Sequence, residues 1–235
     1  MIGDKEYSHP HQKVVRARVD GPAPDIVDRY RRMYTGLIAD HLGKAICCHR
    51  EISPIQYGMR VCGPAVTAAG PDLSVRRMAI DLARPGDVLV VAAGGDVSYS
   101  CFGDGTASRM MLKDMEGVVI DGLSRDVAGI RSLGFPTFAR GSTPRNFHYP
   151  QEGGYGAVNV PVNIGGVTVN PGDLVFGDDD GVVVVPKDLA EELISEIEQN
   201  FIAEVNFRGD MKSYQPFDVV EILRSRGYRF EEGSE

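Results

Sequence analysis

The stretch VVIDGLSRD, residues 118–126, decides how this chain folds. It begins as an apolar, β-branched run and continues with a carboxylate, a glycine, and an adjacent cation and anion. Such a run predicts a buried strand, and the residues just after a buried strand form the loop where binding groups usually lie. The stretch therefore predicts an α/β domain with a site at the C-terminal end of this strand.

Arg125 and Asp126 are the candidate site residues of this stretch. A guanidinium holds a carboxylate or an oxyanion through two parallel hydrogen bonds, and a carboxylate holds a hard divalent cation. Together they predict a site for a small oxo acid and a metal. The structural alternatives are that Asp121 accepts turn amides, that Asp126 caps the next helix and that Arg125 is a solvated surface charge.

The composition is that of a globular protein with an ordinary core. The chain has 235 residues, of which 43% are hydrophobic and 25% charged, and its net charge of -8 disfavours broad binding to nucleic acid or anionic membranes. It lacks an apolar run of about 18 residues and an apolar signal-peptide centre near Met1. Four cysteines without a Cys-x-x-Cys pair favour reduced thiols. We therefore expect a cytoplasmic protein without nucleic-acid or membrane partners.

Helical and strand patterns alternate before a strand-rich second half. The helical spacings are at 26–33, 36–42 (with Thr35 as N-cap), 75–82, 107–115, 187–204 (apolar at Leu189, Leu193, Ile197 and Phe201) and 217–224. The strand patterns are at 65–69, 88–92, from 117, and at 158–162, 167–169, 174–176 and 182–185. This order predicts one α/β domain over 21–206, an N-terminal, loosely ordered arm at 1–20 and a C-terminal helical tail at 207–235.

The glycine-rich segment FGDGTA, residues 102–107, is the natural partner of the Arg-Asp pair. Glycines let a backbone approach a ligand closely, and the start of a helix offers unpaired amides and a positive dipole end. We therefore take Gly103, Asp104, Gly105 and Thr106 as substrate-binding candidates. Asp104 has two open roles, as a helix cap or as a group that orients a metal and its waters.

Several motifs follow one another in the order found in one enzyme family. They are GPAVT (63–67), PGDVLVV (85–91), GVVIDG (117–122), RD (125–126), FPTFARG (135–141), NVPV (159–162), GGV (165–167), PGD (171–173) and DDDGVVVVP (178–186). On these motifs, over roughly residues 35 to 205, the chain resembles the class II pyruvate aldolases that cleave 4-hydroxy-4-methyl-2-oxoglutarate and 4-carboxy-4-hydroxy-2-oxoadipate. Their superfamily includes the regulator of ribonuclease activity A proteins.

The resemblance implies a fold, an assembly and roles for the site residues. The fold is a single-domain α-β-β-α sandwich of the swivelling phosphohistidine-domain type with terminal helical extensions, and the assembly is a homotrimer or homohexamer with sites between subunits. Arg125 would contact pyruvate, and Asp126 would ligate Mg²⁺ or Mn²⁺. The amides of residues 103–106 would hold the pyruvate carboxylate, and Asp104 would hydrogen-bond a water on the metal.

The family also uses a C-terminal acidic residue from a neighbouring subunit. Three glutamates of the predicted helix 187–204 are candidates here: Glu196, Glu198 and Glu204. Gly105 and Thr106 depart from the family, which usually carries larger aliphatic residues at these positions.

The resemblance therefore implies a metal-dependent lyase. It would cleave a 4-hydroxy-2-oxo acid to pyruvate and a second oxo compound, and it would decarboxylate oxaloacetate through the same enolate. The alternative is a non-catalytic regulator that binds a ribonuclease. Methyl transfer ranks last, because the chain has no convincing adenosylmethionine-binding glycine motif.

Other polar residues carry weaker signals. Arg140 and Arg145 are either solvated or contact a distal substrate carboxylate. His41 is a packing or surface residue of a predicted helix. Cys101 lies near the glycine segment without a histidine in motif relation, which disfavours a thiol nucleophile.

Overall fold

The computed structural model describes residues 13–70, 72–146, 156–209 and 219–230. Contacts divide the chain into two units, Met1–Glu198 and Gln199–Glu235. The first unit contains the sheet, its helices and all the candidate site residues except Glu204. The second contains the end of α6 (Lys187–Gly209) and α7 (Val219–Ser225).

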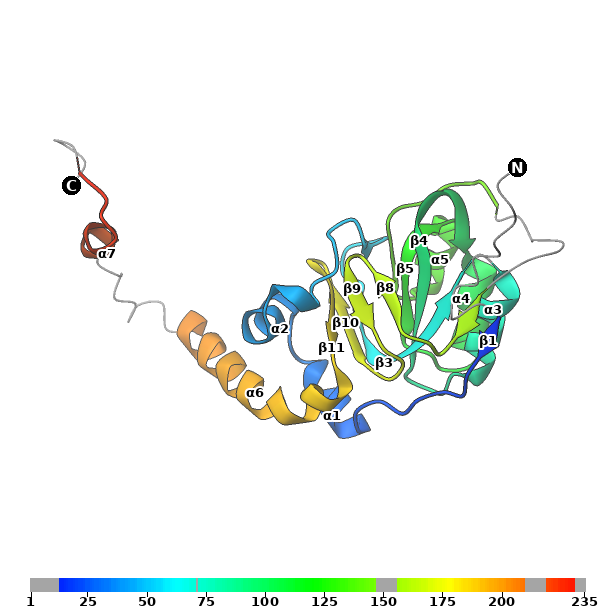
Figure 1. Ribbon diagram of the computed structural model, residues 1–235, viewed down its shortest axis with the longest axis horizontal. Coiled ribbons are helices and arrows are strands. Elements are labelled where there is room, and N and C mark those ends of the chain that lie inside the picture. Colours follow the sequence, from blue (N-terminus) through cyan, green and yellow to red (C-terminus); the bar gives the residue numbers. More distant parts are fainter. Residues whose placement is uncertain (1–12, 71, 147–155, 210–218, 231–235) are drawn as a thin grey trace, which may run out of the picture. The chain divides into compact units, whose positions relative to one another are not determined.

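Four parallel strands form the centre of the first unit (Figure 1). They are β3 (Val61–Ala69), β4 (Val88–Phe102), β5 (Gly117–Ser124) and β6 (Thr137–Ala139), side by side in that order. Short strands extend the sheet at its edges: β7 (Ala157–Val158) and β1 (Val14–Val15) beside β3, and β2 (Ser53–Pro54) beside β6. The predicted strand stretch 118–126 thus lies in the centre of the sheet, with neighbours on both sides.

Two hairpins complete the β structure. The antiparallel pair β10 (Leu174–Asp178) and β11 (Gly181–Val185) joins the sheet because β10 also pairs with β3. The pair β8 (Val162–Ile164) and β9 (Val167–Val169) forms a sheet of its own. These valine-rich hairpins pack on one face of the central strands.

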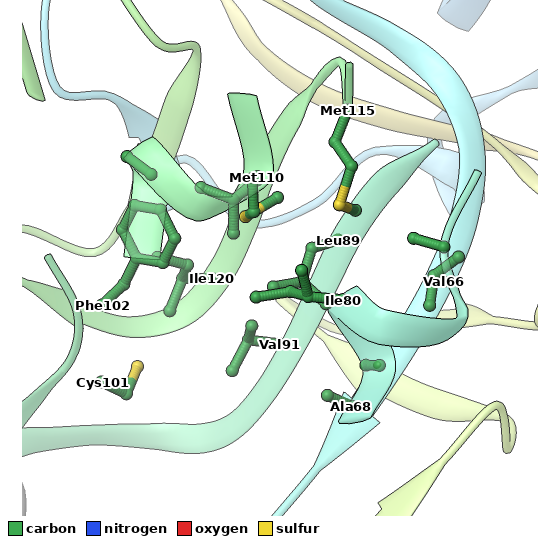
Figure 2. Packing of buried hydrophobic residues seen from close by; sticks show 14 of the residues in the cluster. Val66, Ala68, Ile80, Leu89, Val91, Cys101, Phe102, Met110, Met115 and Ile120 are labelled. Carbon is green, nitrogen blue, oxygen red and sulfur yellow. The ribbon is translucent and has the colours of Figure 1, made fainter. Parts of the chain in front are cut away.

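Helices α3 (Leu73–Leu82), α4 (Asp104–Met111) and α5 (Val127–Leu133) pack on the opposite face. Strand alternation explains the two cores: Leu89 and Val91 lie in the helical cluster, whereas Val88 and Val90 lie in the hairpin cluster. Figure 2 shows the helical cluster, in which Ile80 of α3 packs over the central strands. Both faces of the central strands are therefore buried, which is why their sequences are continuous apolar runs.

The α/β prediction is confirmed as a mixed α/β fold with a large mixed sheet, whereas the sandwich type implied by the resemblance stays a prediction. Among the residues that the structure describes, no helix is long and apolar enough to span a bilayer.

Several element boundaries differ from the sequence-based prediction. The first helix is α1 (Pro24–Tyr30), which ends earlier than expected, and the predicted strand 158–162 is two separate strands, β7 and β8. Helix α4 begins at Asp104, three residues before the predicted start. Strand β4 is the largest difference, since it runs on to Phe102 through register shifts opposite β5. The β propensity of a short segment does not predict such bulges, because they depend on how the strand pairs with its partner.

One predicted helix cap is wrong, and one predicted apolar helix face is only partly confirmed. Thr35 is the first residue of α2 (Thr35–Leu42) and not its cap, and its backbone N and Oγ both donate to the Asp178 carboxylate, over 2.8 and 2.7 Å. On α6 the predicted Ile197 is buried, together with Ala190 and Ile194, whereas the predicted Leu189 is 38% exposed.

The described part of the N-terminal arm is held firmly, contrary to the loosely ordered arm that we expected. Val14 and Val15 pair in parallel with β7. Arg18 donates to both oxygens of the buried Asp87, from Nε over 2.6 Å and from Nη2 over 2.7 Å. The remainder of the arm, residues 1–12, lies outside the described residues.

Candidate functional site

The glycine segment is the start of a helix and not a free loop. Strand β4 ends at Phe102, and Gly103 is the N-cap residue of α4. The amides of Thr106 and Ala107 donate to the Gly103 carbonyl over 3.0 and 3.1 Å. The two amides before them belong to Asp104 and Gly105, at helix positions that have no intrahelical acceptor. These amides and the helix dipole can receive an anionic group.

The next strand brings Arg125 and Asp126 beside that helix start. Arg125 follows the last residue of β5, and its amide donates to the Phe102 carbonyl over 2.8 Å, so the ends of β4 and β5 are joined. Arg125 Nε lies 3.1 Å from Asp126 Oδ2, and the two side chains are 38% and 37% exposed. The pair is therefore accessible to a ligand while its backbone is fixed.

Asp126 has the backbone geometry of a constrained site residue. Its φ of 55° and ψ of 37° are left-handed, a conformation that costs a non-glycine residue on the order of 1 kcal/mol or more. It occupies the N-cap position of α5, but its side chain makes no capping hydrogen bond. The capping alternative for Asp126 is therefore wrong.

Two glycines let the acidic side chains lie against the neighbouring helix. A Cβ on Gly103 would lie 2.5 Å from Asp126 Oδ2, and a Cβ on Gly129 of α5 would lie 2.5 Å from Asp104 Oδ2. Each carboxylate thus packs against a glycine of the other helix start or helix. A side chain in place of either glycine would displace the carboxylate that lies there. Asp104 is the first residue of α4, whereas the cap position is Gly103, so the structure does not support the cap role for Asp104.

These groups line one cavity of about 410 Å³. The cavity also contacts α3, so it lies between the helix layer and the C-terminal ends of β4 and β5. Its charged lining residues are Asp104, Asp126, Arg76, Arg77, Arg109 and Arg125. Four cations against two anions give the lining a formal charge of +2, in a chain whose net charge is -8. The cavity therefore suits an anionic ligand.

Asp121, in the same strand, has a structural role. Its Oδ1 pairs with Arg140 Nε, and its Oδ2 accepts the Gly165 amide over 3.2 Å. The side chains of Asp121 and Arg140 are 7% and 20% exposed. Asp121 thus accepts a hydrogen bond from a turn amide, which was one of the alternatives. The turn is the one between β8 and β9, and the sequence did not reveal the ion pair with Arg140.

The weaker candidates lie elsewhere or have other contacts. Neither Arg140 nor Arg145 lines the cavity, and the Arg145 carbonyl accepts from the amide and hydroxyl of Ser100. His41 Nδ1 lies 3.1 Å from the Leu37 carbonyl of its own helix. Cys101 does line the cavity, but burial raises the pKa of its thiol to about 11, so it is a poor nucleophile near neutral pH.

The C-terminal glutamates differ in their surroundings. Glu198 Oε2 pairs with Arg29 Nη2 over 2.6 Å, which holds the pKa of Glu198 below its usual value. Glu196 is exposed on α6, and Glu204 belongs to the second unit. Within the described residues, no cluster of three or more histidine, cysteine or acidic side chains could hold a metal. A metal at Asp126 would therefore need ligands from water, substrate or another subunit.

The sequence-based prediction did not include Arg76 and Arg77, which line the cavity, or Gly129, which lies against Asp104. Arg76 falls on the same helical face as Ala79 and Ile80, at the i, i+3, i+4 spacing, and all three are buried. A charged residue on an otherwise apolar helix face was the available signal. Gly129 gave no signal, because only the packing of α5 against α4 brings it to Asp104.

Comparison with known proteins yields one family. The family model described as "RraA-like: Aldolase/RraA" matches residues 23–184. A Halalkalibacterium halodurans protein named "Putative 4-hydroxy-4-methyl-2-oxoglutarate aldolase" is 36% identical over 173 residues, which cover 72% of this chain and 80% of that protein.

Two solved structures are similar to this chain, and one of them belongs to the same family. Streptomyces coelicolor RraAS2, described as an unusual member of the RNase ES inhibitor RraA protein family, has a TM-score of 0.69 and 32% identity, covering 80% of this chain and 98% of its own. A Pseudomonas syringae protein has a TM-score of 0.73 and 26% identity, covering 84% of this chain and 97% of its own.

Proposed function

This chain belongs to the RraA-like, aldolase/RraA family, and from that premise we propose that it is a divalent-metal-dependent carbon–carbon lyase. Its substrate is a 4-hydroxy-2-oxo acid, which it cleaves to pyruvate and a second oxo compound. It decarboxylates oxaloacetate as a side activity, since both reactions produce the pyruvate enolate. The observation that carries the proposal is that one cavity is lined by both the Arg125-Asp126 pair and the first residues of α4.

The chemistry of the side chains supports a hard metal ion. Asp126 and Asp104 supply carboxylate oxygens at one cavity, and Mg²⁺ or Mn²⁺ binds through one or two carboxylates with waters completing its shell. Asp126 would hold the metal, and Asp104 would orient its waters. When bound, the metal supplies Lewis-acid polarisation of the 2-oxo group.

The chain's own groups account for binding and charge stabilisation. The amides of Asp104 and Gly105 hold the C1 carboxylate at the start of α4, where the helix dipole is favourable. Thr106, in the same turn, lines the cavity beside them. Arg125 donates to the oxygen on which negative charge develops, and one such donor is typically worth about 10²–10³ in rate.

The electron flow then follows from the substrate. The 4-hydroxyl proton leaves to a water in the cavity, which Asp104 orients. The C3–C4 bond breaks, its electron pair passes into the 2-oxo-acid half as an enolate, and the hydroxyl carbon becomes the second carbonyl. Protonation of the enolate at C3 gives pyruvate. The negative charge on this oxygen is larger in the transition state than in the bound substrate. Arg125 therefore stabilises the transition state more than it stabilises the bound substrate.

We extend the proposal to the assembly. The protein forms a homotrimer or homohexamer in which an acidic residue near the C-terminus of one subunit completes a neighbour's site. Two features support this. The described residues offer only two carboxylates at the cavity, and exposed apolar side chains such as Val97 and Tyr99 lie on the bulged part of β4. Sedimentation analysis of the purified protein measures the subunit number directly.

The first experiment measures pyruvate release through lactate dehydrogenase. Purified protein is incubated with oxaloacetate or with racemic 4-hydroxy-4-methyl-2-oxoglutarate, with Mg²⁺, with Mn²⁺ or with a chelator. We expect metal-dependent pyruvate release above the background of metal alone. Asp126→Ala and Arg125→Ala should abolish it, while Arg84→Gln, which removes an exposed cation distant from these residues in the fold, should not.

The same experiment distinguishes the lyase from the alternative of a non-catalytic, ribonuclease-binding protein. The relative RraAS2 is described as belonging to a family of ribonuclease inhibitors, so a non-catalytic chain would bind a ribonuclease and release no pyruvate. An inhibitor has no need for an accessible Arg-Asp pair in a cavity. Inactivity with both substrates and both metals, together with capture of a ribonuclease, would overturn the lyase proposal.

A further inference from the structure

The starts of helices α4 and α5 are interlocked through two glycines. The Asp104 carboxylate, at the start of α4, lies against Gly129 of α5. The Asp126 carboxylate, just before α5, lies against Gly103, the N-cap residue of α4. The contact is therefore reciprocal, since each of the two helix starts provides one carboxylate and one glycine.

Gly129 contacts the Asp104 side chain closely. A Cβ on Gly129 would lie 2.5 Å from Asp104 Oδ2, 3.0 Å from its Cβ and 3.1 Å from its Cγ. Gly129 lies within α5 and its φ is not positive, so its backbone conformation does not require glycine. Glycine also destabilises a helix relative to alanine. The contact with Asp104 is thus the physical reason for glycine at this position.

Packing fixes the separation of the two helix starts. Met110 of α4 and Ile130 of α5 are fully buried in the same helical cluster, where Figure 2 labels Met110. Just before the two helices, the Arg125 amide donates to the Phe102 carbonyl over 2.8 Å. A side chain at position 129 would therefore displace Asp104 more readily than it would separate the helices.

Gly129 lies behind the wall of the cavity. Asp104, Arg125 and Asp126 line the cavity, whereas Gly129 does not. A change at Gly129 thus reaches a bound ligand through Asp104 and leaves the other lining groups in place. Gly103 has the corresponding contact with Asp126, but it lines the cavity itself, so a substitution there would also change the ligand's surroundings.

Resting on the proposed function, we propose that Gly129 is a positioning residue for the lyase reaction. Its missing side chain lets the Asp104 carboxylate take the orientation in which it holds the cavity water that accepts the 4-hydroxyl proton. Gly129 touches neither substrate nor metal and acts through Asp104. A misplacement of about 1 Å at a group that positions a reacting atom can lower a rate by about 10².

Two substrates that differ in their need for this water test the role. Cleavage of 4-hydroxy-4-methyl-2-oxoglutarate releases a hydroxyl proton, whereas oxaloacetate loses carbon dioxide without releasing one. With Mg²⁺, Gly129→Ala should lower pyruvate release from the first substrate by about 10² and from oxaloacetate by less than about tenfold. Equal losses with both substrates would indicate general damage to the site and would overturn the positioning role.

A double-mutant cycle measured by thermal unfolding tests the contact without any need for activity. Gly129→Ala should lower the unfolding midpoint by about 4 °C, because the added methyl group overpacks against Asp104. In the Asp104→Ala background the same substitution should not lower the midpoint, since the displaced carboxylate is absent and alanine is the better helix former. Equal losses in both backgrounds would overturn the proposal. If Gly129→Ala alone fails to fold, recovery of folding in the double variant supports the contact and its absence contradicts it.

Gly36→Ala is the matched control. Gly36 lies in α2, where an added Cβ would be 3.7 Å from the nearest atom, a ring carbon of Tyr34. This distance is an ordinary van der Waals contact. The variant makes the same chemical change in another helix of the first unit, and it should keep both rates within about twofold and the midpoint within about 2 °C.

Failure of the positioning role and failure of the lyase proposal are distinguishable. An active wild-type protein with an equally active Gly129→Ala variant would overturn the positioning role alone. A wild-type protein that releases no pyruvate with either metal would overturn the lyase proposal. The unfolding cycle then still decides whether Gly129 positions Asp104: coupling supports it, and additive shifts of the midpoint overturn it.

Discussion

Two arginine–aspartate pairs differ in almost every physical respect, although β5 carries the aspartate of one and leads into the other. Arg125 and Asp126 are sequence neighbours, 3.1 Å apart and more than a third exposed, at the wall of a cavity. Asp121 lies within β5 and Arg140 directly follows β6; both are largely buried, and the Gly165 amide also donates to the aspartate. The same two residue types therefore form an accessible pair at a cavity in one place and a buried structural pair in the other.

Solvent access decides between these roles. A buried pair is stable only when its partners stay together, because separating them leaves an uncompensated charge. Separating an accessible pair costs little free energy, because water solvates both charges. The arginine is then able to contact a substrate and the aspartate a metal. The left-handed backbone of Asp126 adds to the contrast, since strain of this kind accumulates at functional sites.

The largest effect should be the loss of activity at the accessible pair. Asp126→Ala and Arg125→Ala should each lower the rate of pyruvate release from oxaloacetate by about 10³, since the first removes the proposed metal ligand and the second the proposed donor to the developing charge. Their thermal unfolding midpoints should remain within about 4 °C of the wild type. Full activity in either folded variant would end the functional distinction between the two pairs.

The buried pair should show the reverse behaviour. Asp121→Ala leaves Arg140 without its partner and should lower the free energy of unfolding by about 3 kcal/mol, measured with urea. The double variant with Arg140→Ala should lose less than the sum of the two single variants. Strictly additive losses would mean that the pair is not coupled.

Two substitutions of Asp126, to glycine and to alanine, should have the same effect on activity and different effects on the free energy of unfolding. Asp126→Gly relieves the left-handed strain and should raise the free energy of unfolding by about 1 kcal/mol relative to Asp126→Ala, although both variants are inactive. Asp121→Gly, in an extended strand, should show no such gain over Asp121→Ala. Equal stability of the two Asp126 variants would show that its backbone stores no strain.

The smallest effect is expected at Cys101, which lines the same cavity as Arg125. Burial raises the pKa of its thiol to about 11, so the thiol stays protonated and unreactive below that pH. Cys101→Ala should keep the rate within about twofold from about pH 6 to about pH 9, and iodoacetamide should not label Cys101 in the folded protein. Rapid labelling with loss of activity would place the thiol in the mechanism.

The sequence by itself determined the central strand, the α/β class and the position of Arg125 and Asp126 after that strand. These features are local: an apolar run of strand length, followed by a turn, has the same meaning in any chain that buries it. The glycine segment was likewise predicted to adjoin the start of a helix, although α4 begins at Asp104, three residues earlier than its helical spacing indicated.

Only the tertiary structure decided which charges share an environment. Asp121 and Asp126 are five positions apart, yet strand alternation and the β8–β9 turn bury one while the cavity exposes the other. Arg76 enters the cavity because α3 packs over β3 and β4, and Gly129 meets Asp104 because α5 packs against α4. Burial and contact between distant residues depend on how elements pack, and no local pattern contains that information.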